Sequence, residues 1–256
     1  GAQQILSKRL GVPVTIGNLR YSLLYQQLVL ENVGIGKLQE IKIDAIAISA
    51  FPTTLFGDAK SFDEVEATSV SIDQESLVMV PEWIKQQPAG QSLHVRRLKL
   101  RSVKLAVKAL ELQPFDADIS LGSNGALRRA RLSDGKLRLD ISPKDKAMRV
   151  GLEANNWKPP LGPAVEFDEL TLEAIFEPQQ ASITNIEGKI GFAPVKGSAR
   201  ANWGSGGIRV EGDFSVTKGD LAKLMAMLTR DFSATGQLNA SATYVLQGTT
   251  LENLFA

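Results

Sequence analysis

Apolar and polar side chains alternate along much of the chain, most clearly over residues 93–154. Successive side chains of a β-strand point to opposite faces of the sheet, so each alternating run predicts a strand with one apolar and one polar face. Turn-forming residues separate these runs at 122–125, 133–135 and 142–145. The pattern predicts an antiparallel meander with one apolar side.

Further alternating segments flank this meander. Those before it lie at 14–16, 28–35, 41–48 and 65–72. Those after it recur about every ten residues between positions 165 and 246, a spacing typical of a long antiparallel sheet. Helical spacing is limited to short segments at 3–10, at 75–86 as a helix or covering loop, and at Leu221–Leu228. The chain is therefore predicted to be mainly β with a few short helices.

The apolar positions change parity within some of these segments. Three such switches occur, from Ala45 to Ile46, from Ala67 to Val70 and from Val107 to Leu110. A shift of one residue turns all later side chains of a strand to its other face, so each switch predicts a bulge or a bend. Because bulges curve a sheet, the predicted architecture is an elongated, curved antiparallel sheet that forms an incomplete barrel or groove.

Two arrangements would use the apolar positions differently. Two sheets packed face to face would bury them as an ordinary core, whereas a single curved sheet would leave them lining an open trough. The trough is favoured because the few predicted helices cannot cover the ~15 strands that the turn spacing suggests. The positions expected on its concave face are Leu105, Val107, Leu137, Leu139, Ile141, Val150, Leu152, Leu170, Leu172 and Phe176.

Two segments are expected along the chain. Residues 1–90 are predicted to form an N-terminal helix and a β segment, and residues 91–256 a continuing antiparallel groove with a helix near 220–229. The glutamine- and proline-containing stretch 86–91 is a predicted linker between them. We interpret Gly1-Ala2 and the interrupted pattern at Phe255-Ala256 as the limits of an excised fragment, truncated at its C-terminus.

Composition argues against several classes of function. Lys+Arg 29 against Asp+Glu 28 leaves a formal charge of +1, which does not favour a nucleic-acid binder. Cysteine is absent, so there is no disulfide, thiol nucleophile or thiolate metal ligand. The single histidine, His94, begins a strand pattern and is interpreted as an ordinary strand residue. We expect no catalytic residue, metal or cofactor.

Basic residues gather in one stretch, at 96–108. They could form a patch against anionic lipid headgroups. However, Arg97, Lys99 and Arg101 alternate with the apolar Leu98 and Leu100, which is the position of a solvated strand face. The solvated face is the favoured interpretation.

Two segments of the sequence resemble a known family. The first, ILSKRLGVPVTIGNLRYSLLYQQLVLENVGIG, combines a helix, Leu-Gly, a short strand and a strand ending in Asn-Val-x-Ile. The second, DLAKLMAMLTRDFSATGQLNASATYVLQGTTLENLF, combines an Asp-Leu helix, a Gly-x-Leu strand and Gly-x-x-Leu-x-x-Leu. Together they resemble the AsmA-like family of repeating β-groove, bridge-like lipid transfer proteins.

This resemblance implies a protein of the Gram-negative periplasm, attached to the inner membrane by a helix that precedes residue 1. It implies a non-enzymatic groove that holds or conducts phospholipid acyl chains towards the outer membrane, with phospholipid and other envelope proteins as partners. The alternative is an assembly factor for outer-membrane biogenesis that binds protein partners at an exposed sheet edge. The family supplies no catalytic residues.

Overall fold

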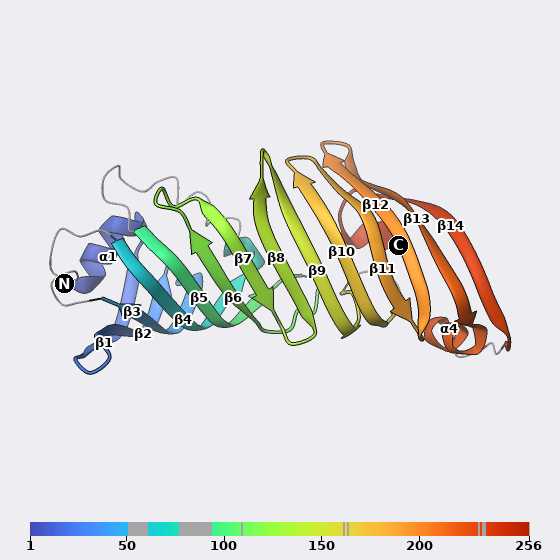
Figure 1. Cartoon of the computed structure of the whole chain (residues 1–256). Helices are drawn as coiled ribbons and strands as arrows, with labels where there is room; N and C mark the ends of the chain where they lie inside the picture. Colours follow the sequence, from blue (N-terminus) through green and yellow to red (C-terminus); the bar gives the residue numbers. More distant parts are fainter. Residues whose placement is uncertain are drawn as a thin grey trace. The chain divides into compact units, whose positions relative to one another are not determined.

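The computed structural model describes residues 1–50, 61–76, 94–108, 110–160, 162, 164–229, 231 and 234–255. The chain is mainly β with a few short helices, and its sheet is curved and not closed into a barrel, which confirms the predicted fold class (Figure 1). It divides into two compact units, Gly1–Asp134 and Gly135–Ala256. In each unit the strands are neighbours in chain order.

The first unit contains α1 and seven strands. The helix α1 spans Ala2–Leu10. The strands are β1 (Val14–Ser22), β2 (Gln27–Ile35), β3 (Ile41–Ser49), β4 (Ser61–Asp73), β5 (His94–Ala106), β6 (Phe115–Leu121) and β7 (Leu127–Ser133). All of their pairings are antiparallel with the exception of β4 with β5.

The parallel pairing of β4 and β5 corrects the prediction of a uniformly antiparallel sheet. Ser61 lies opposite His94, and Asp73 lies opposite Ala106. Parallel neighbours need a crossover of about a dozen residues or more, and residues 74–93 supply it. Most of the predicted covering segment and the whole predicted linker fall within 77–93, outside the described residues. The two compact units meet after Asp134, and the predicted division into residues 1–90 and 91–256 stays a prediction.

A row of irregular positions crosses the first five strands. The register places Gly17, Asn32, Asp44, Ser69 and Ser102 side by side, and regular pairing is interrupted at each of them. Asn32, Ser69 and Ser102 have left-handed φ angles of 53°, 55° and 55°. Position 17 requires glycine, because a Cβ there would lie 2.9 Å from the Cβ of Asn32. We call this row the crease.

The crease accounts for two of the predicted parity switches. The switches at Ala45–Ile46 and Ala67–Val70 lie beside Asp44 and Ser69, and both are confirmed as irregularities of the strands. Because the irregular positions of these strands lie side by side, the strands change parity together, and their apolar residues stay on one face of the sheet. The third predicted switch is wrong: β5 ends at Ala106, and a turn follows that is closed by a bridge between Val107 and Leu110.

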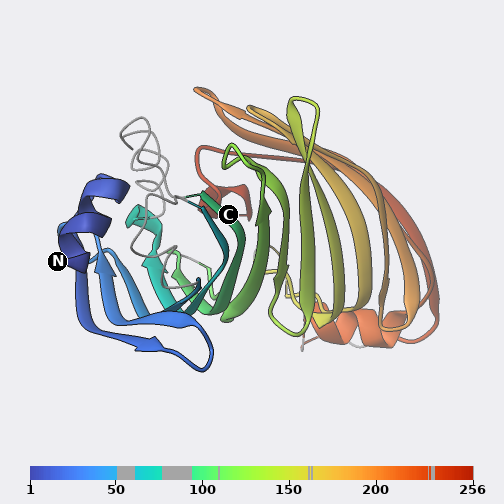
Figure 2. The same ribbon diagram turned by 60° about the vertical axis from the view of Figure 1, so that its left-hand side comes forward.

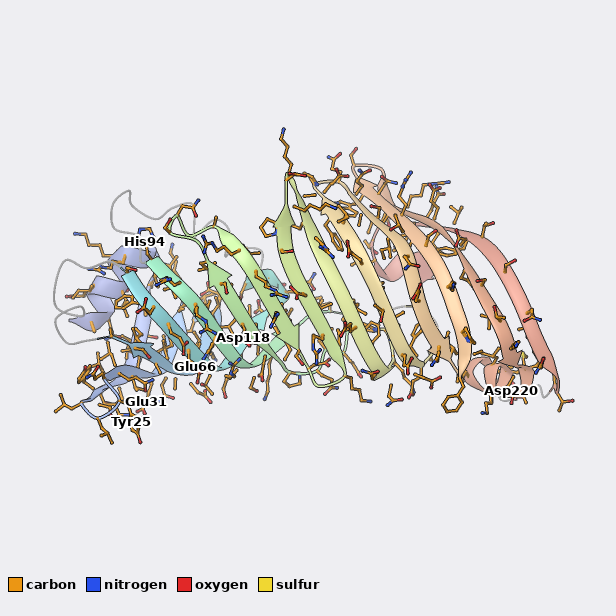
Figure 3. The ribbon with its side chains drawn as sticks, in the orientation of Figure 1. Tyr25, Glu31, Glu66, His94, Asp118 and Asp220 are labelled. Carbon is orange, nitrogen blue, oxygen red and sulfur yellow. The ribbon has the colours of Figure 1, made fainter. Side chains whose placement is uncertain are left out.

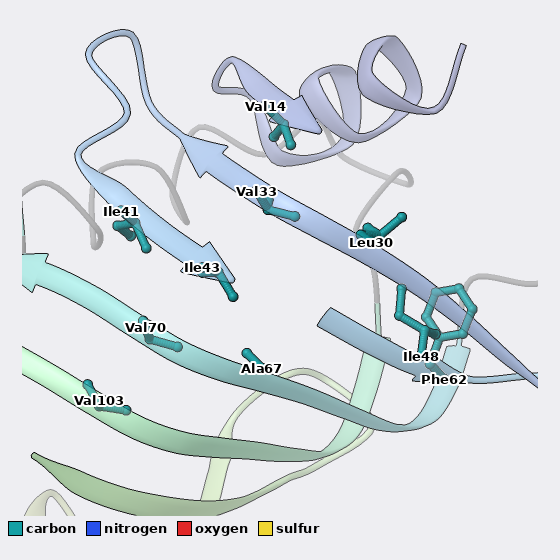
Figure 4. Packing of buried hydrophobic residues seen from close by; sticks show 10 residues of the cluster. All are labelled: Val14, Leu30, Val33, Ile41, Ile43, Ile48, Phe62, Ala67, Val70 and Val103. Carbon is teal, nitrogen blue, oxygen red and sulfur yellow. The ribbon is translucent and has the colours of Figure 1, made fainter. Parts of the chain in front are cut away.

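The apolar face of β1–β5 forms a closed hydrophobic core. Its buried residues point into a common interior (Figure 4) and are Val14, Leu30, Val33, Ile41, Ile43, Ile48, Phe62, Ala67, Val70 and Val103. Leu6 and Leu10 of α1 pack against them. The backbone N–H of Val14 donates to the Ser7 hydroxyl at 2.8 Å, which fixes α1 to the start of β1. The curvature of these strands is visible in Figure 2.

The second unit contains seven antiparallel strands and two short helices. The strands are β8 (Leu137–Lys144), β9 (Ala147–Trp157), β10 (Phe167–Glu177), β11 (Gln180–Ile190), β12 (Ala193–Gly204), β13 (Gly207–Asp220) and β14 (Gln237–Gly248). The helices are α4 (Leu221–Leu228) and the 3-10 helix η1 (Glu252–Phe255). The predicted helix at 221–228 is confirmed, and the Asp220 carboxylate caps it by accepting a hydrogen bond from Lys223 N–H at 3.3 Å.

Candidate functional site

The register of the second unit assembles one continuous apolar face. Leu139 lies opposite Leu152, and Leu152 opposite Leu172. Directly opposed residues of an antiparallel pair share a face, so this row can be followed through every strand. The face includes Leu137, Leu139, Ile141, Met148, Val150, Leu152, Ala154, Leu170, Leu172, Ala174, Phe176, Ala181, Ile183, Ile186, Val195, Ala199, Ala201, Trp203, Ile208, Val210, Phe214, Val216, Leu238, Ala240, Ala242, Tyr244 and Leu246. We call it the second-unit apolar face.

Most large side chains on this face are partly or fully accessible to solvent, although Leu170 and Val195 are buried. Phe176 and Phe214 are 41% and 42% exposed, and Leu139, Leu152 and Leu172 are partly buried. The cluster of buried residues that forms a core lies in the first unit. Over the described ranges no second sheet packs on this face, because the strands of the unit follow one another side by side. The described part of the second unit is therefore not a sandwich, and its apolar face is open.

The opposite face carries cross-strand ion pairs. Arg138 pairs with Glu153 at 3.6 Å, with both side chains at least 65% exposed. Arg149–Glu173 and Lys189–Glu169 are separated by 2.6 Å and 3.2 Å. Exposed pairs of this kind contribute only about 0–1 kcal/mol each, so their significance is that this face is hydrated. The two faces of the unit differ sharply in polarity.

Short helices contact the ends of the last two strands. The side chain of Leu224 in α4 lies against Gly219, at one end of β13, and fills the space that a Cβ on this glycine would need. The backbone of η1 lies against Gly248 at the other end of β14, and Leu254 is buried there. Gly219 and Gly248 share the apolar face with their partners Leu238 and Ile208. The middle of the face is left open between the two helices.

Tyr244 is the titratable group on the apolar face. Its hydroxyl donates to the carbonyl oxygen of Ser198 at 3.2 Å, and its ring centroid lies 6.5 Å from that of Phe214. Burial, assisted by the Asp213 carboxylate, raises the pKa of Tyr244 above its ordinary value. The hydroxyl therefore remains a neutral hydrogen-bond donor.

We predict that Gly212→Ala destabilises the second unit. Gly212 lies opposite Tyr244, and a methyl group there would collide with the Ser198 carbonyl oxygen and the Tyr244 hydroxyl. Overpacking of this kind costs about 1–3 kcal/mol, which should lower the melting temperature. Gly204→Ala is the matched control, because no atom lies within 4 Å of its new methyl group. Equal melting temperatures for the two variants would contradict the packing described.

Eight of the ten predicted groove residues lie together on the second-unit apolar face, on β8, β9 and β10. Leu105 and Val107 are not part of this face, because they belong to the first unit. Leu105 shares the face of the buried Val103 and lies opposite Ile72, and Val107 lies in the bridge after β5. The prediction omitted the contributions of β11–β14, although Phe214 and Tyr244 follow the same alternation.

The basic stretch of β5 is paired with acids. Arg97 and Lys99 lie 3.9 Å and 3.1 Å from Glu64, and Arg101 lies 3.0 Å from Asp118. These pairs reduce the net positive charge of the stretch. Arg97 is 62% exposed, as a solvated strand face predicts, whereas Lys99 and Arg101 are only 26% and 32% exposed.

No family model, curated protein or solved structure matches the chain. Within the described part of the chain, no group of His, Cys, Asp and Glu side chains is placed to hold a metal ion. None of the described helices is long and apolar enough to cross a bilayer.

Proposed function

We propose that the chain is a non-enzymatic lipid-binding protein whose second-unit apolar face holds phospholipid acyl chains. The observation that carries the proposal is the open, partly exposed apolar face across β8–β14, opposite a face of ion pairs. Large exposed apolar surfaces are rare on soluble monomers and mark binding sites. Each methylene buried there would contribute about 0.8 kcal/mol.

The dimensions of the face suit this ligand. Strands lie about 4.8 Å apart, so seven strands span on the order of 30 Å. The hydrocarbon core of a bilayer is also about 30 Å thick, and one extended acyl chain covers about half of it. The face therefore offers length enough for an acyl chain, with the headgroup left in water.

The resemblance of the sequence to AsmA-like proteins supports the wider proposal. On this proposal the full-length protein is anchored to the inner membrane, lies in the periplasm, and holds or conducts phospholipid between the inner and outer membranes. Other envelope proteins are its proposed macromolecular partners. Neither a cofactor nor nucleic acid has a part in this function.

The second candidate function is a scaffold for outer-membrane assembly, and one observation favours it. β14 pairs with β13 on one side, and among the described strands none pairs with its other side. Residues 237–248 carry no charge. Such an edge is able to accept a strand from a protein partner. The lipid proposal ranks first because it accounts for the apolar face of all seven strands, whereas the scaffold proposal accounts only for the edge.

Extraction and crosslinking test the lipid proposal together. Organic extracts of the purified protein, analysed by mass spectrometry, should contain phospholipid. Photo-crosslinking probes at Leu139 and Leu152 should capture that lipid, because both residues lie on the apolar face. Probes at Arg138 and Glu153 are the matched controls, because these residues lie directly opposite each other on the charged face. These two probes should not capture lipid. Equal labelling of both sets, or lipid-free protein, would count against the proposal.

A further inference from the structure

The turn between β1 and β2 exposes three consecutive large apolar side chains. Leu23, Leu24 and Tyr25 are 81%, 82% and 71% exposed. Figure 3 shows Tyr25 on the loop that projects beyond the strands of the first unit. We call these residues the hairpin tip. Their exposure contrasts with Leu30 on the same hairpin, which is 2% exposed.

The described segments next to the hairpin tip, on β1, β2 and the end of β3, are uncharged. Residues 21–30 contain no Asp, Glu, Lys or Arg, and neither do residues 45–50 at the end of β3. That end of β3 is adjacent, because Ser49 lies opposite Gln27 and Ala50 N–H donates to the carbonyl oxygen of Gln26. Charged side chains oppose entry into a bilayer, so the hairpin tip itself meets little such opposition. Across the strand register, the nearest charges are on β4 and β5, where Glu64 lies opposite Ser49 and is 3.9 Å from Arg97.

The backbone of the turn is partly satisfied within the hairpin. Tyr25 N–H donates to the Ser22 hydroxyl at 3.4 Å, and Gln26 has a left-handed φ of 49°. The carbonyl oxygen of Gln26 accepts from Ala50 N–H at 3.2 Å. Unsatisfied backbone groups are costly in an apolar medium, and these bonds reduce that cost.

The area of the tip distinguishes a bilayer from a protein partner. The three side chains expose on the order of 400 Å², about half of what one partner buries in a standard protein interface. Shallow insertion into a bilayer needs no such area, because lipid molecules pack around the inserted side chains. Tyrosine suits this position, since its ring is apolar and its hydroxyl stays at the headgroup level.

We propose that the hairpin tip inserts into the surface of a phospholipid bilayer and docks the first unit on it. The tip adjoins the apolar face of that unit, where Tyr21 lies opposite Leu28 and Leu28 opposite Ile48. Docking is driven by apolar burial and not by charge, in keeping with the formal net charge of +1. This interaction goes beyond the acyl-chain binding proposed for the second unit and does not depend on it.

Vesicle sedimentation tests the docking. The full chain should sediment with phosphatidylcholine vesicles, and equally with vesicles that also contain phosphatidylglycerol, at low and high salt. Replacing Leu23, Leu24 and Tyr25 together with Ser should weaken binding roughly tenfold or more, since binding scales with the apolar area that inserts. Leu38→Ser is the matched control, because Leu38 is 85% exposed in the turn between β2 and β3.

A single fluorescent label locates the contact. The chain has no cysteine, so Leu24→Cys and Leu38→Cys each accept one environment-sensitive dye. Vesicles should shift the emission of the dye at position 24 to the blue and leave that at position 38 unchanged. The proposal is overturned if the unsubstituted protein does not bind vesicles or if the triple variant binds them equally well. It is also overturned if binding requires anionic lipid. Leu139→Asp should still bind vesicles, which separates this result from the occupancy of the second-unit apolar face.

Discussion

Leu30→Asp is expected to unfold the first unit. Leu30 is 2% exposed and sits inside the core formed by β1–β5. The substitution removes a packed side chain, at about 2–5 kcal/mol, and buries a carboxylate without a partner, at several kcal/mol more. The sum approaches the ~5–15 kcal/mol that keeps a domain folded. Circular dichroism and thermal unfolding should show the loss of a cooperative transition.

Leu19→Asp is the control for this prediction. Leu19 lies directly opposite Leu30 but on the edge strand β1, where it is 45% exposed. Its carboxylate would stay hydrated, so this variant should fold. If both variants unfolded, or if both folded, the contrast between a closed core and an open strand would have no support.

Leu139→Asp should have the opposite outcome in the second unit. Leu139 lies in the row with Leu152 and Leu172 on the second-unit apolar face, where a carboxylate can remain in water. The variant should be folded and soluble, with a modest fall in melting temperature. Co-purifying phospholipid should be clearly lost, because a charge in the row opposes the entry of an acyl chain.

Arg138→Asp introduces the same side chain one residue away, on the charged face. It removes an exposed ion pair with Glu153, which is worth at most about 1 kcal/mol, and should keep its lipid. If Leu139→Asp unfolds or aggregates and the parent carries no lipid, the lipid proposal fails. The scaffold proposal then takes its place.

The sequence was sufficient for the strands and for the capped helix at the end of β13. Alternation with period 2 and clusters of turn residues identify strands without reference to tertiary contacts. Strand direction is different, because alternation reads the same in a parallel and an antiparallel pair. The available signal for the parallel step was length: residues 74–93 are far more than a hairpin needs.

The candidate face was predicted where its strands are regular. On β8, β9 and β10 the alternation alone placed Leu139, Leu152 and Leu172 together. β11 contains an irregularity between Ile183 and Ile186 that reverses parity partway along the face. β13 and β14 keep the alternation through Phe214 and Tyr244, but alternation does not show that their apolar sides adjoin those of β8–β10. Leu105 shows a further limit. Parity assigns a residue to a face of its strand, but not to one of two units.

The pairing of strands with their neighbours in the chain bears on how the molecule folds. In each unit a strand finds its partner next in sequence, usually across a turn of a few residues, so most pairings close short loops. Short loops cost little entropy and form quickly. Each unit can therefore grow one strand at a time from its N-terminal end, with every finished strand serving as the template for the next. The exception is the step from β4 to β5, where Asp73 and His94 must be bridged by a long crossover before pairing continues. That step is expected to be the slow one in the assembly of the first unit.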